Sequence, residues 1–300
     1  MSIRQITIIG TGLIGGSLAL SLKKGGFRGK IVGCDSSQVL AKAKRLRVVD
    51  GGSSDPLQAC AGSDIVVLAV PVGGIIALID KLAPHLSGNT LLTDVGSTKA
   101  QILETARAAF GTDAKIRFLG GHPMAGKENS GVEFADPDLF RGAVWFFCPL
   151  PKQRLNSGKI GEYVSWIRKI GAKPALLEPA EHDELCAWIS HVPQMISTAL
   201  ASTLVEEYGR NAPLLETGGR ALREMTRTAA SPYSMWRDIA ITNKKPIGNS
   251  LLKLEQKLAH IRENLDSRGL EAEFEQAHAL KSHSPRRRGV TERSKTKARS

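Results

Sequence analysis

A glycine-rich run at residues 10–15, GTGLIG, constrains the fold of this chain more than any other feature. It directly follows the β-branched run at residues 6–9, Ile-Thr-Ile-Ile, and it leads into a helical pattern over residues 13–24. Strand, glycine loop and helix in this order are typical of the first unit of a doubly wound sheet. The first glycine permits the tight turn after the strand, and the third lets the helix pack close to that strand.

The same loop predicts a binding site for a dinucleotide. Its middle glycine lets the backbone approach a pyrophosphate, and the helix that follows offers free N–H groups and the positive end of its dipole. Asp35 directly follows the second predicted strand, where a carboxylate accepts hydrogen bonds from a ribose and repels the 2′-phosphate of NADP. The sequence therefore predicts NAD as the cofactor. The residues expected to bind it are Gly10, Gly12, Leu13, Ile14, Gly15, Asp35, Val70 and Pro71.

Alternating strands and helices in the first half indicate an α/β fold. Strands are expected at residues 6–9, 30–34, 64–70, 90–93, 116–119, 143–148 and 174–177, with helices between most of them. This order predicts a Rossmann-type doubly wound sheet over residues 1–177. Beyond it the pattern is helical only, at residues 180–208, 213–228, 232–242, 246–264 and 270–280. We expect an all-helical domain at 178–280 and a disordered basic tail at 281–300.

The formal net charge of +12 raises the question of nucleic-acid binding. Eight of the 41 basic residues and one of the 29 acidic residues fall in the last 20 positions. More than half of the positive excess therefore lies in a segment with almost no large apolar side chain, which favours disorder. The folded body gives no indication of binding nucleic acid, whereas contact of the tail with RNA or anionic lipid stays open.

Cysteine usage and the absence of long apolar runs suggest a cytoplasmic enzyme. Cys34, Cys60, Cys148 and Cys186 form no CxxC pair, so neither a disulfide framework nor a zinc site is indicated, and no metal is expected. No apolar run approaches the ~18–20 residues of a membrane span. The chain begins with a strand pattern instead of a charged leader, so a secretory signal is not expected.

Polar residues follow two of the predicted strands, at the carboxyl ends where ligands bind in such sheets. Ser97 and Lys99 follow the strand at 90–93, and His122 lies in the segment GGHPMAGKE at 120–128. A histidine in a glycine-rich loop is expected to be exposed and to titrate near neutrality, so it can take a proton from a substrate hydroxyl. The alternatives are a first-turn surface position for Lys99 and a turn histidine bonded to its own loop for His122.

Six segments occur in an order that resembles the prephenate/arogenate dehydrogenase family of tyrosine biosynthesis. The resemblance covers about residues 3–265, and its fourth and sixth segments are far more specific than the glycine loop. The segments are GTGLIGGS (10–17), LAVP (68–71), DVGSTK (94–99), GGHPMAGKENSGVEFA (120–135), HDELCAWISHVPQ (182–194) and MTRTAASPYSMWRDI (225–239). It implies an NAD-dependent oxidative decarboxylation that converts prephenate to 4-hydroxyphenylpyruvate, or alternatively arogenate to tyrosine.

The resemblance also implies roles for individual residues. His122 would be the catalytic group at the substrate hydroxyl, with Ser97 assisting it. Arg227 would bind a substrate carboxylate, which agrees with the bidentate fork that arginine offers to an anion. Glu128 matches an acid at the cleft. Gln194 stands where many members carry a histidine, so the choice between the two substrates stays open.

Two histidines on the long predicted helix compete for a place at the site. His182 and His191 are nine residues apart, which places them on nearly opposite faces of an ideal helix. We therefore expect one of them to face the substrate, and we favour His191.

Apolar residues spaced by three and four at 247–261 suggest a helix face that packs within the chain or in the homodimer that the family implies. A β-hydroxyacid dehydrogenase shares this domain order, but it uses a lysine of the helical domain that has no counterpart in a matching setting here. A non-catalytic NAD-sensing protein would not need His122 together with Arg227.

Overall fold

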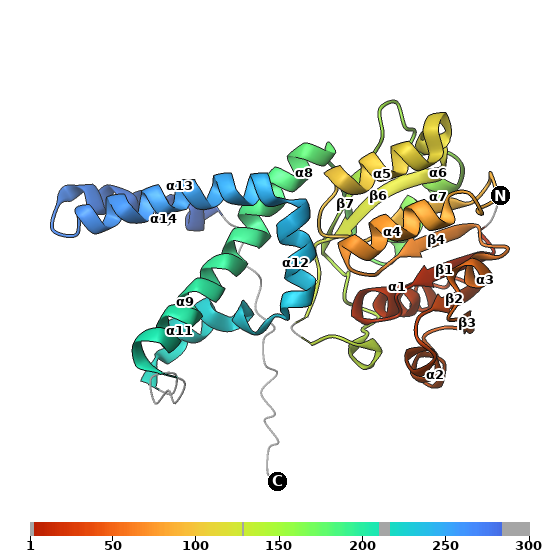
Figure 1. Ribbon diagram of the computed structural model, residues 1–300, viewed down its shortest axis with the longest axis horizontal. Coiled ribbons are helices and arrows are strands. Elements are labelled where there is room, and N and C mark those ends of the chain that lie inside the picture. Colours follow the sequence, from red (N-terminus) through yellow and green to blue (C-terminus); the bar gives the residue numbers. More distant parts are fainter. Residues whose placement is uncertain (1–2, 128, 210–216, 284–300) are drawn as a thin grey trace, which may run out of the picture. The chain divides into compact units, whose positions relative to one another are not determined.

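The computed structural model describes residues 3–127, 129–209 and 217–283 (Figure 1). Its contacts divide the chain into two units, Met1–Ser250 and Leu251–Ser300. No helix in the described ranges is long and apolar enough to cross a membrane.

An eight-stranded sheet in the order β3-β2-β1-β4-β5-β6-β7-β8 forms the centre of the first unit. The strands are β1 (Gln5–Ile9), β2 (Lys30–Cys34), β3 (Gly51–Ser53), β4 (Ile65–Leu68), β5 (Leu91–Asp94), β6 (Phe118–Pro123), β7 (Val144–Cys148) and β8 (Lys173–Leu176). All neighbours pair in parallel except β6 and β7, which are antiparallel. The predicted doubly wound sheet is confirmed, while β3 was not predicted from the sequence.

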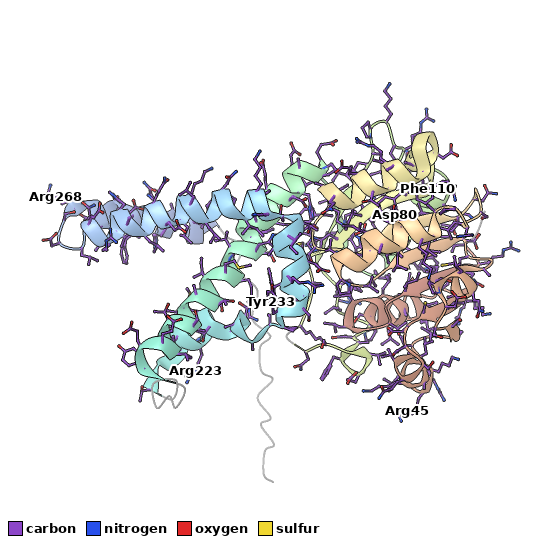
Figure 2. All side chains as sticks on the ribbon, in the orientation of Figure 1. Arg45, Asp80, Phe110, Arg223, Tyr233 and Arg268 are labelled. Atoms are coloured by element: carbon purple, nitrogen blue, oxygen red, sulfur yellow. The ribbon has the colours of Figure 1, made fainter. Side chains whose placement is uncertain are left out.

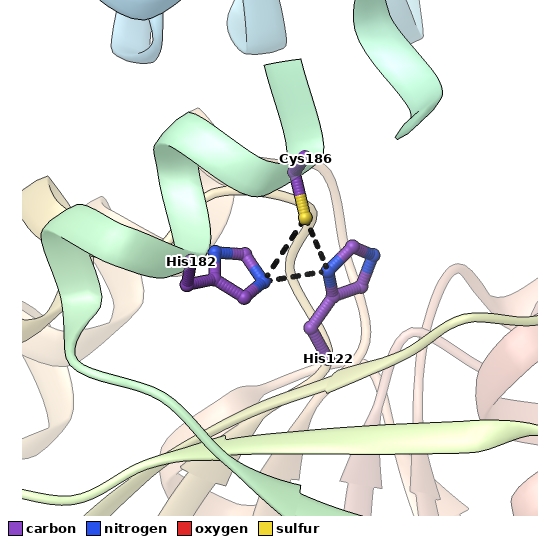
Figure 3. Close-up of side chains that lie close together, drawn as sticks. All are labelled: His122, His182 and Cys186. Atoms are coloured by element: carbon purple, nitrogen blue, oxygen red, sulfur yellow. Dashed lines mark hydrogen bonds between the residues drawn. The ribbon is translucent and has the colours of Figure 1, made fainter. Parts of the chain in front are cut away.

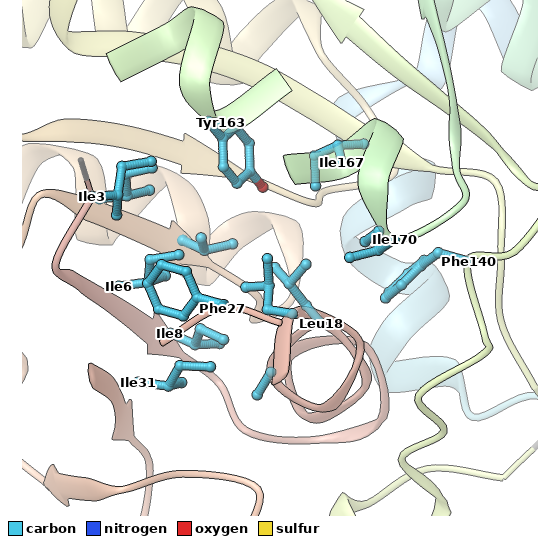
Figure 4. Packing of buried hydrophobic residues seen from close by; sticks show 14 of the residues in the cluster. Ile3, Ile6, Ile8, Leu18, Phe27, Ile31, Phe140, Tyr163, Ile167 and Ile170 are labelled. Carbon is cyan, nitrogen blue, oxygen red and sulfur yellow. The ribbon is translucent and has the colours of Figure 1, made fainter. Parts of the chain in front are cut away.

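Helices cover both faces of this sheet. They are α1 (Leu13–Lys24), α2 (Ser37–Arg45), α3 (Pro56–Cys60), α4 (Val72–Leu82), α5 (Ala100–Phe110), α6 (Ala114–Arg117) and α7 (Gly158–Lys169), with 3₁₀ turns η1 (Gly111–Asp113) and η2 (Val132–Phe134). Residues of α1 and α7 pack in one apolar cluster, and residues of α3, α4 and α5 pack in another. Figure 4 shows part of the first cluster between the sheet and its helices.

The alternation of side chains along β4 explains these two clusters. Ile65 and Val67 belong to the cluster that contains Leu18 of α1, whereas Val66 and Leu68 belong to the other. Successive residues of a strand point to opposite faces, so a strand buried on both faces must be apolar throughout. Each such side chain contributes about 1.5–3 kcal/mol when it is fully buried.

Only helices follow β8 in the described residues. They are α8 (Pro179–Cys186), the π-helix η3 (Ala187–His191), α9 (Val192–Tyr208), α11 (Gly219–Thr226), the 3₁₀ turn η4 (Arg227–Ala230), α12 (Tyr233–Thr242), α13 (Lys244–Glu263) and α14 (Arg268–His283). The predicted helix over 180–208 is therefore interrupted by a π-helix just before Pro193. The helix α14 reaches His283, so the first three residues of the predicted tail are helical, and residues 284–300 lie outside the described ranges.

Candidate active site

Two glycines of the loop leave no room for a side chain, and a third has open space beside it. Gly10 has a φ of +92°, and a Cβ at this position would lie 2.3 Å from the Ala69 carbonyl oxygen. A Cβ at Gly15 would lie 2.0 Å from the Gly10 carbonyl oxygen. A Cβ at Gly12, in contrast, would meet no atom within 4 Å among the described residues. The backbone before α1 is thus open to a ligand where a pyrophosphate would approach.

Asp35 lies beside this loop at the end of β2 and is half-buried. Its Oδ2 atom accepts hydrogen bonds from the Thr11 backbone N–H at 2.8 Å and from the Thr11 hydroxyl at 3.2 Å. Its Oδ1 atom accepts the Ser36 N–H at 2.8 Å. The carboxylate is therefore held next to the glycine loop.

The other residues expected at the cofactor lie around the same edge of the sheet. Leu13 and Ile14 form the half-buried first turn of α1, and Val70 and Pro71 follow β4. A Cβ at Gly10 would lie 2.8 Å from Cγ1 of Val70, so the two loops are in contact. Together these residues fit a bound dinucleotide.

Asp94 and Lys99 form an ion pair whose side chains are both fully buried. Asp94 Oδ2 also accepts the Gly96 N–H at 2.8 Å, and Oδ1 accepts the Gly121 N–H at 3.1 Å. Lys99 is therefore not a surface residue, and the alternative of a first-turn surface lysine is wrong. Buried charges of opposite sign require such pairing, and this pair fixes the loop that carries the half-buried Ser97.

His122 lies in a strand, not in an exposed loop. β6 extends to Pro123 because it pairs with β7, and His122 stands opposite Phe146 with 8% of its surface exposed. Burial holds the pKa of His122 well below its ordinary value, and electrostatic interactions with His182, Lys99 and His191 act in the same direction. The expectation that this histidine is exposed and titrates near neutrality is wrong. It is a neutral imidazole, which can accept a proton.

A chain of hydrogen bonds fixes which nitrogen of His122 carries hydrogen. Asp183 Oδ1 lies 2.8 Å from His182 Nδ1. His182 Nε2 lies 2.9 Å from His122 Nδ1, the contact drawn in Figure 3. A carboxylate only accepts, so His182 carries its hydrogen on Nδ1. Burial lowers the pKa of His182, so its Nε2 is unprotonated and accepts from His122 Nδ1–H. His122 Nε2 then holds a lone pair.

Asp183 also connects this chain to the sheet domain. Its carboxylate oxygens accept the backbone N–H groups of Lys99 at 2.7 Å and Ala100 at 2.9 Å, at the start of α5. A carboxylate is stabilised at a helix N-terminus because it satisfies free N–H groups and faces the positive end of the dipole. One buried side chain therefore caps α5 and orients His182.

The structure differs from the prediction that His191 alone faces the site. His182 is the histidine that contacts His122, while His191 is also buried and close enough to influence the pKa of His122. The π-helix at Ala187–His191 explains the difference, because its wider turn changes the phase of the helix between the two residues.

His191 presents a buried N–H group that has no hydrogen-bond partner among the described residues. Its Nδ1 accepts a hydrogen bond from Asn243 Nδ2 at 3.0 Å, and the same Nδ2 donates to the Asp183 carbonyl oxygen at 2.8 Å. The hydrogen of the neutral ring therefore lies on Nε2, which has no hydrogen-bond partner within the described ranges. Burial lowers the pKa of His191 to about 4. Such an unsatisfied donor costs about 1–3 kcal/mol, which a ligand that accepts the hydrogen bond would recover.

Gln194 and Arg227 are connected through η4. The side-chain nitrogen of Gln194 donates to the Thr228 carbonyl oxygen at 2.9 Å and to Thr198 Oγ1 at 3.1 Å. Gln194 lies on α9, so these hydrogen bonds anchor η4 to α9. Arg227 is the first residue of η4, and its side chain is exposed. Glu128 lies outside the described residues.

Comparison with known proteins identifies the family. The profile described as "Prephenate dehydrogenase, nucleotide-binding domain" matches residues 18–174, and "Prephenate dehydrogenase, dimerization domain" matches residues 178–279. The chain belongs to the prephenate dehydrogenase family. A prephenate dehydrogenase of Lactococcus lactis is 33% identical, over 93% of this chain and 77% of the relative.

Solved structures of the prephenate dehydrogenase family share the whole fold. The Aquifex aeolicus prephenate dehydrogenase, in complex with hydroxyphenyl propionate and NAD⁺, is 31% identical with a TM-score of 0.81, over 94% of this chain and 96% of that one. The Synechocystis arogenate dehydrogenase is 28% identical with a TM-score of 0.74, over 93% and 99%. The predicted family and fold class are both confirmed.

Proposed function

We propose that the protein converts prephenate to 4-hydroxyphenylpyruvate with NAD⁺ as the hydride acceptor. The observation that carries this proposal is the hydrogen-bond chain from Asp183 through His182 to His122, which leaves an unprotonated nitrogen at the carboxyl edge of a nucleotide-binding sheet. Asp35 beside the open Gly12 favours NAD⁺ over NADP⁺, because a second phosphate would be repelled. The similarity to the Lactococcus lactis and Aquifex aeolicus prephenate dehydrogenases supports the same activity.

The reaction needs one proton acceptor at a defined atom. The C4–H bond breaks with its electron pair, which NAD⁺ accepts as hydride when it is bound. His122 Nε2 takes the proton of the C4 hydroxyl and later returns it to the same oxygen. The ring carboxylate leaves as CO₂, and its electron pair completes the aromatic ring. His182 and Asp183 act by holding His122 in the tautomer that can accept the proton.

We assign substrate binding to four polar side chains. Prephenate is a dianion, and we assign one carboxylate to Arg227 and an acceptor oxygen to the unpartnered Nε2–H of His191. Ser97 lies on the loop fixed by Asp94 and would orient the C4 hydroxyl. Gln194 already uses its nitrogen to anchor η4, so its oxygen is the atom through which it would reach the substrate side chain.

Arogenate is the second candidate substrate. It carries an ammonium group where prephenate has a keto group, and the amide oxygen of Gln194 can accept a hydrogen bond from that ammonium. Steady-state rates with prephenate and arogenate, each with NAD⁺ and NADP⁺, decide between the two. We expect the highest kcat/KM with prephenate and NAD⁺. Absence of NADH formation with both substrates would refute the proposed function.

Two substitutions test the assigned roles. His122→Asn should lower kcat by about 10²–10⁴-fold because it removes the proton acceptor. Arg227→Ala should mainly raise KM, because it removes binding to the substrate carboxylate. His85→Asn, at an exposed histidine after α4, is the matched control and should leave both constants unchanged. Turnover by His122→Asn at the wild-type rate would show that the roles are assigned wrongly.

We also propose a homodimer formed through the helical domain, in the cytoplasm. The C-terminal family profile is described as a dimerization domain. Large apolar side chains there are exposed, including Tyr233 on α12 (76%, Figure 2) and, in the second unit, Phe274 on α14 (69%). Light scattering after size-exclusion chromatography should give twice the mass of the chain, and Phe274→Glu should shift the protein towards the monomer. A monomeric wild type would contradict the proposal.

A further inference from the structure

Three potential metal ligands from two elements meet beside the predicted base. They are His122 of β6 and His182 and Cys186 of α8, and all three are buried (Figure 3). His122 Nδ1 and His182 Nε2 are 2.9 Å apart, and Cys186 Sγ lies 3.8 Å and 3.4 Å from these two atoms. A single ion placed between these three donor atoms would contact all of them.

The spacing is close to that of a tetrahedral zinc site. With Zn–N bonds of about 2.0–2.1 Å and a Zn–S bond of about 2.3 Å, tetrahedral ligand atoms lie about 3.4 Å apart for two nitrogens and about 3.6 Å for nitrogen and sulfur. Each observed distance differs from these values by about half an ångström or less. Small rotations of the three side chains are sufficient to admit the ion.

The surroundings supply the other features of a zinc site. Asp183 accepts a hydrogen bond from His182 Nδ1 at 2.8 Å, the carboxylate–histidine arrangement that orients metal ligands. Coordinated Cys186 would be a thiolate, so the thiolate and Asp183 together balance two positive charges. The nearby charge of Lys99 is already paired with Asp94.

We propose that His122 Nδ1, His182 Nε2 and Cys186 Sγ bind a Zn²⁺ ion with one coordination position left open. Imidazole nitrogens and a thiolate are ligands that select zinc over magnesium or calcium. The spacing of the cysteines in the sequence does not indicate this site, because only two of its three ligands, His182 and Cys186, are close together in the sequence. The third ligand comes from a strand 60 residues earlier.

The site has a consequence that rests on the proposed function. Zinc on His122 Nδ1 requires the lone pair of that atom, so its hydrogen moves to Nε2 while the thiol proton of Cys186 passes to solvent. Nε2 is the atom that accepts the substrate proton, and in the zinc-bound protein it already carries the ring hydrogen. Zinc is therefore an inhibitor of turnover, not a catalytic ion.

Metal binding is tested first without substrate or NAD⁺. The full-length protein, stripped with a chelator, is titrated with Co²⁺, and Zn²⁺ binding is measured by equilibrium dialysis. We expect one ion per chain, a thiolate-to-cobalt charge-transfer band, and visible bands of four-coordinate Co²⁺. Cys186→Ser should abolish the charge-transfer band and weaken Zn²⁺ binding by more than about 100-fold, since even outer partners contribute 10–100-fold.

Cys60→Ser is the matched control, because Cys60 is also buried and free but belongs to α3. It should bind like the wild type. Absence of the charge-transfer band from the wild type would overturn the proposal without any variant, as would equal Zn²⁺ affinity in Cys186→Ser.

Inhibition is then measured for each protein relative to its own metal-free rate. Zn²⁺ should inhibit the wild type and Cys60→Ser, with recovery on addition of EDTA, and should inhibit Cys186→Ser at more than about 100-fold higher concentration. Equal inhibition of all three proteins would refute the inhibitory role of this site. A protein without dehydrogenase activity would refute the proposed function but leave the cobalt spectrum as a separate result.

Discussion

Replacing Asp183 by asparagine should strongly lower kcat while it preserves the fold. The carboxylate accepts three hydrogen bonds, from Lys99 N–H at 2.7 Å, Ala100 N–H at 2.9 Å and His182 Nδ1–H at 2.8 Å. An asparagine can keep its oxygen towards α5 and turn its NH₂ group towards His182. His182 Nδ1 must then accept, its Nε2 carries the hydrogen, and His122 Nδ1 becomes an acceptor. The hydrogen of His122 moves to Nε2, the atom that should receive the substrate proton.

The size of the effect follows from the role of the base. General base catalysis contributes about 10²–10⁴-fold, and each factor of ten corresponds to about 1.4 kcal/mol of activation free energy. Asp183→Asn should therefore lower kcat by 10²–10⁴-fold, or about 3–5 kcal/mol. The cost in stability is smaller, about 1–3 kcal/mol for a backbone N–H of α5 that loses its acceptor.

The assay compares Asp183→Asn with Asp64→Asn. Asp64 also accepts two backbone N–H groups, from Arg4 at 2.9 Å and Gln5 at 3.1 Å, and it pairs with Lys159. It precedes β4, at the opposite edge of the sheet. Urea unfolding should show a similar loss of stability in both variants, whereas only Asp183→Asn should lose NADH formation, with KM for NAD⁺ unchanged. A kcat of Asp183→Asn within fivefold of the wild type would refute the assigned tautomers.

Three further predictions concern the cofactor loop and the buried histidines. Gly15→Ala should abolish NAD⁺ binding measured by calorimetry, because its Cβ would lie 2.0 Å from the Gly10 oxygen and displace α1; binding at wild-type affinity would contradict this. Asp35→Ala should raise KM for NAD⁺ by about 10–100-fold, the value of a charge-assisted hydrogen bond, and should reduce the preference over NADP⁺; an unchanged ratio of kcat/KM would be evidence against ribose binding. Because burial lowers the pKa of His191 to about 4, the unfolded chain binds a proton below about pH 6.5 that the folded chain does not. The free energy of unfolding should therefore have its full value above pH 6.5 and decrease by about 3 kcal/mol towards pH 4. A urea midpoint that stays constant from pH 7 to pH 5 would disprove this prediction.

The sheet could be predicted because its signals are local. The strands at 6–9 and 30–34 and the glycine loop between them depend on neighbouring residues, and the structure places them within a residue of the predicted bounds. β3 was not predicted, because Gly51–Ser53 has no apolar residue and is a strand only through its pairing with β2.

The surroundings of His122 could not be predicted, because they also depend on pairing with residues that are distant in the sequence. β6 was expected to end at residue 119, and it continues to Pro123 because β7 supplies antiparallel hydrogen bonds to the glycine-rich segment. That pairing buries a histidine that the local pattern places in a loop. The contact of His122 with His182 joins residues 60 positions apart, and nothing in the sequence near either one indicates it.

The helical segment is needed to complete the site, not only to cover it. Asp238 of α12 accepts the Gly73 N–H of α4 at 3.0 Å, and Thr242 shares a hydrogen bond of 2.8 Å with Thr98. These contacts join α12 to the segments that follow β4 and β5. A fragment that ended at residue 177 would keep the glycine loop and His122 but lose Asp183, which orients that histidine through His182. If the proposed roles hold, we expect such a fragment to bind a dinucleotide without catalysing proton transfer, because only the second property depends on residues beyond the nucleotide-binding sheet.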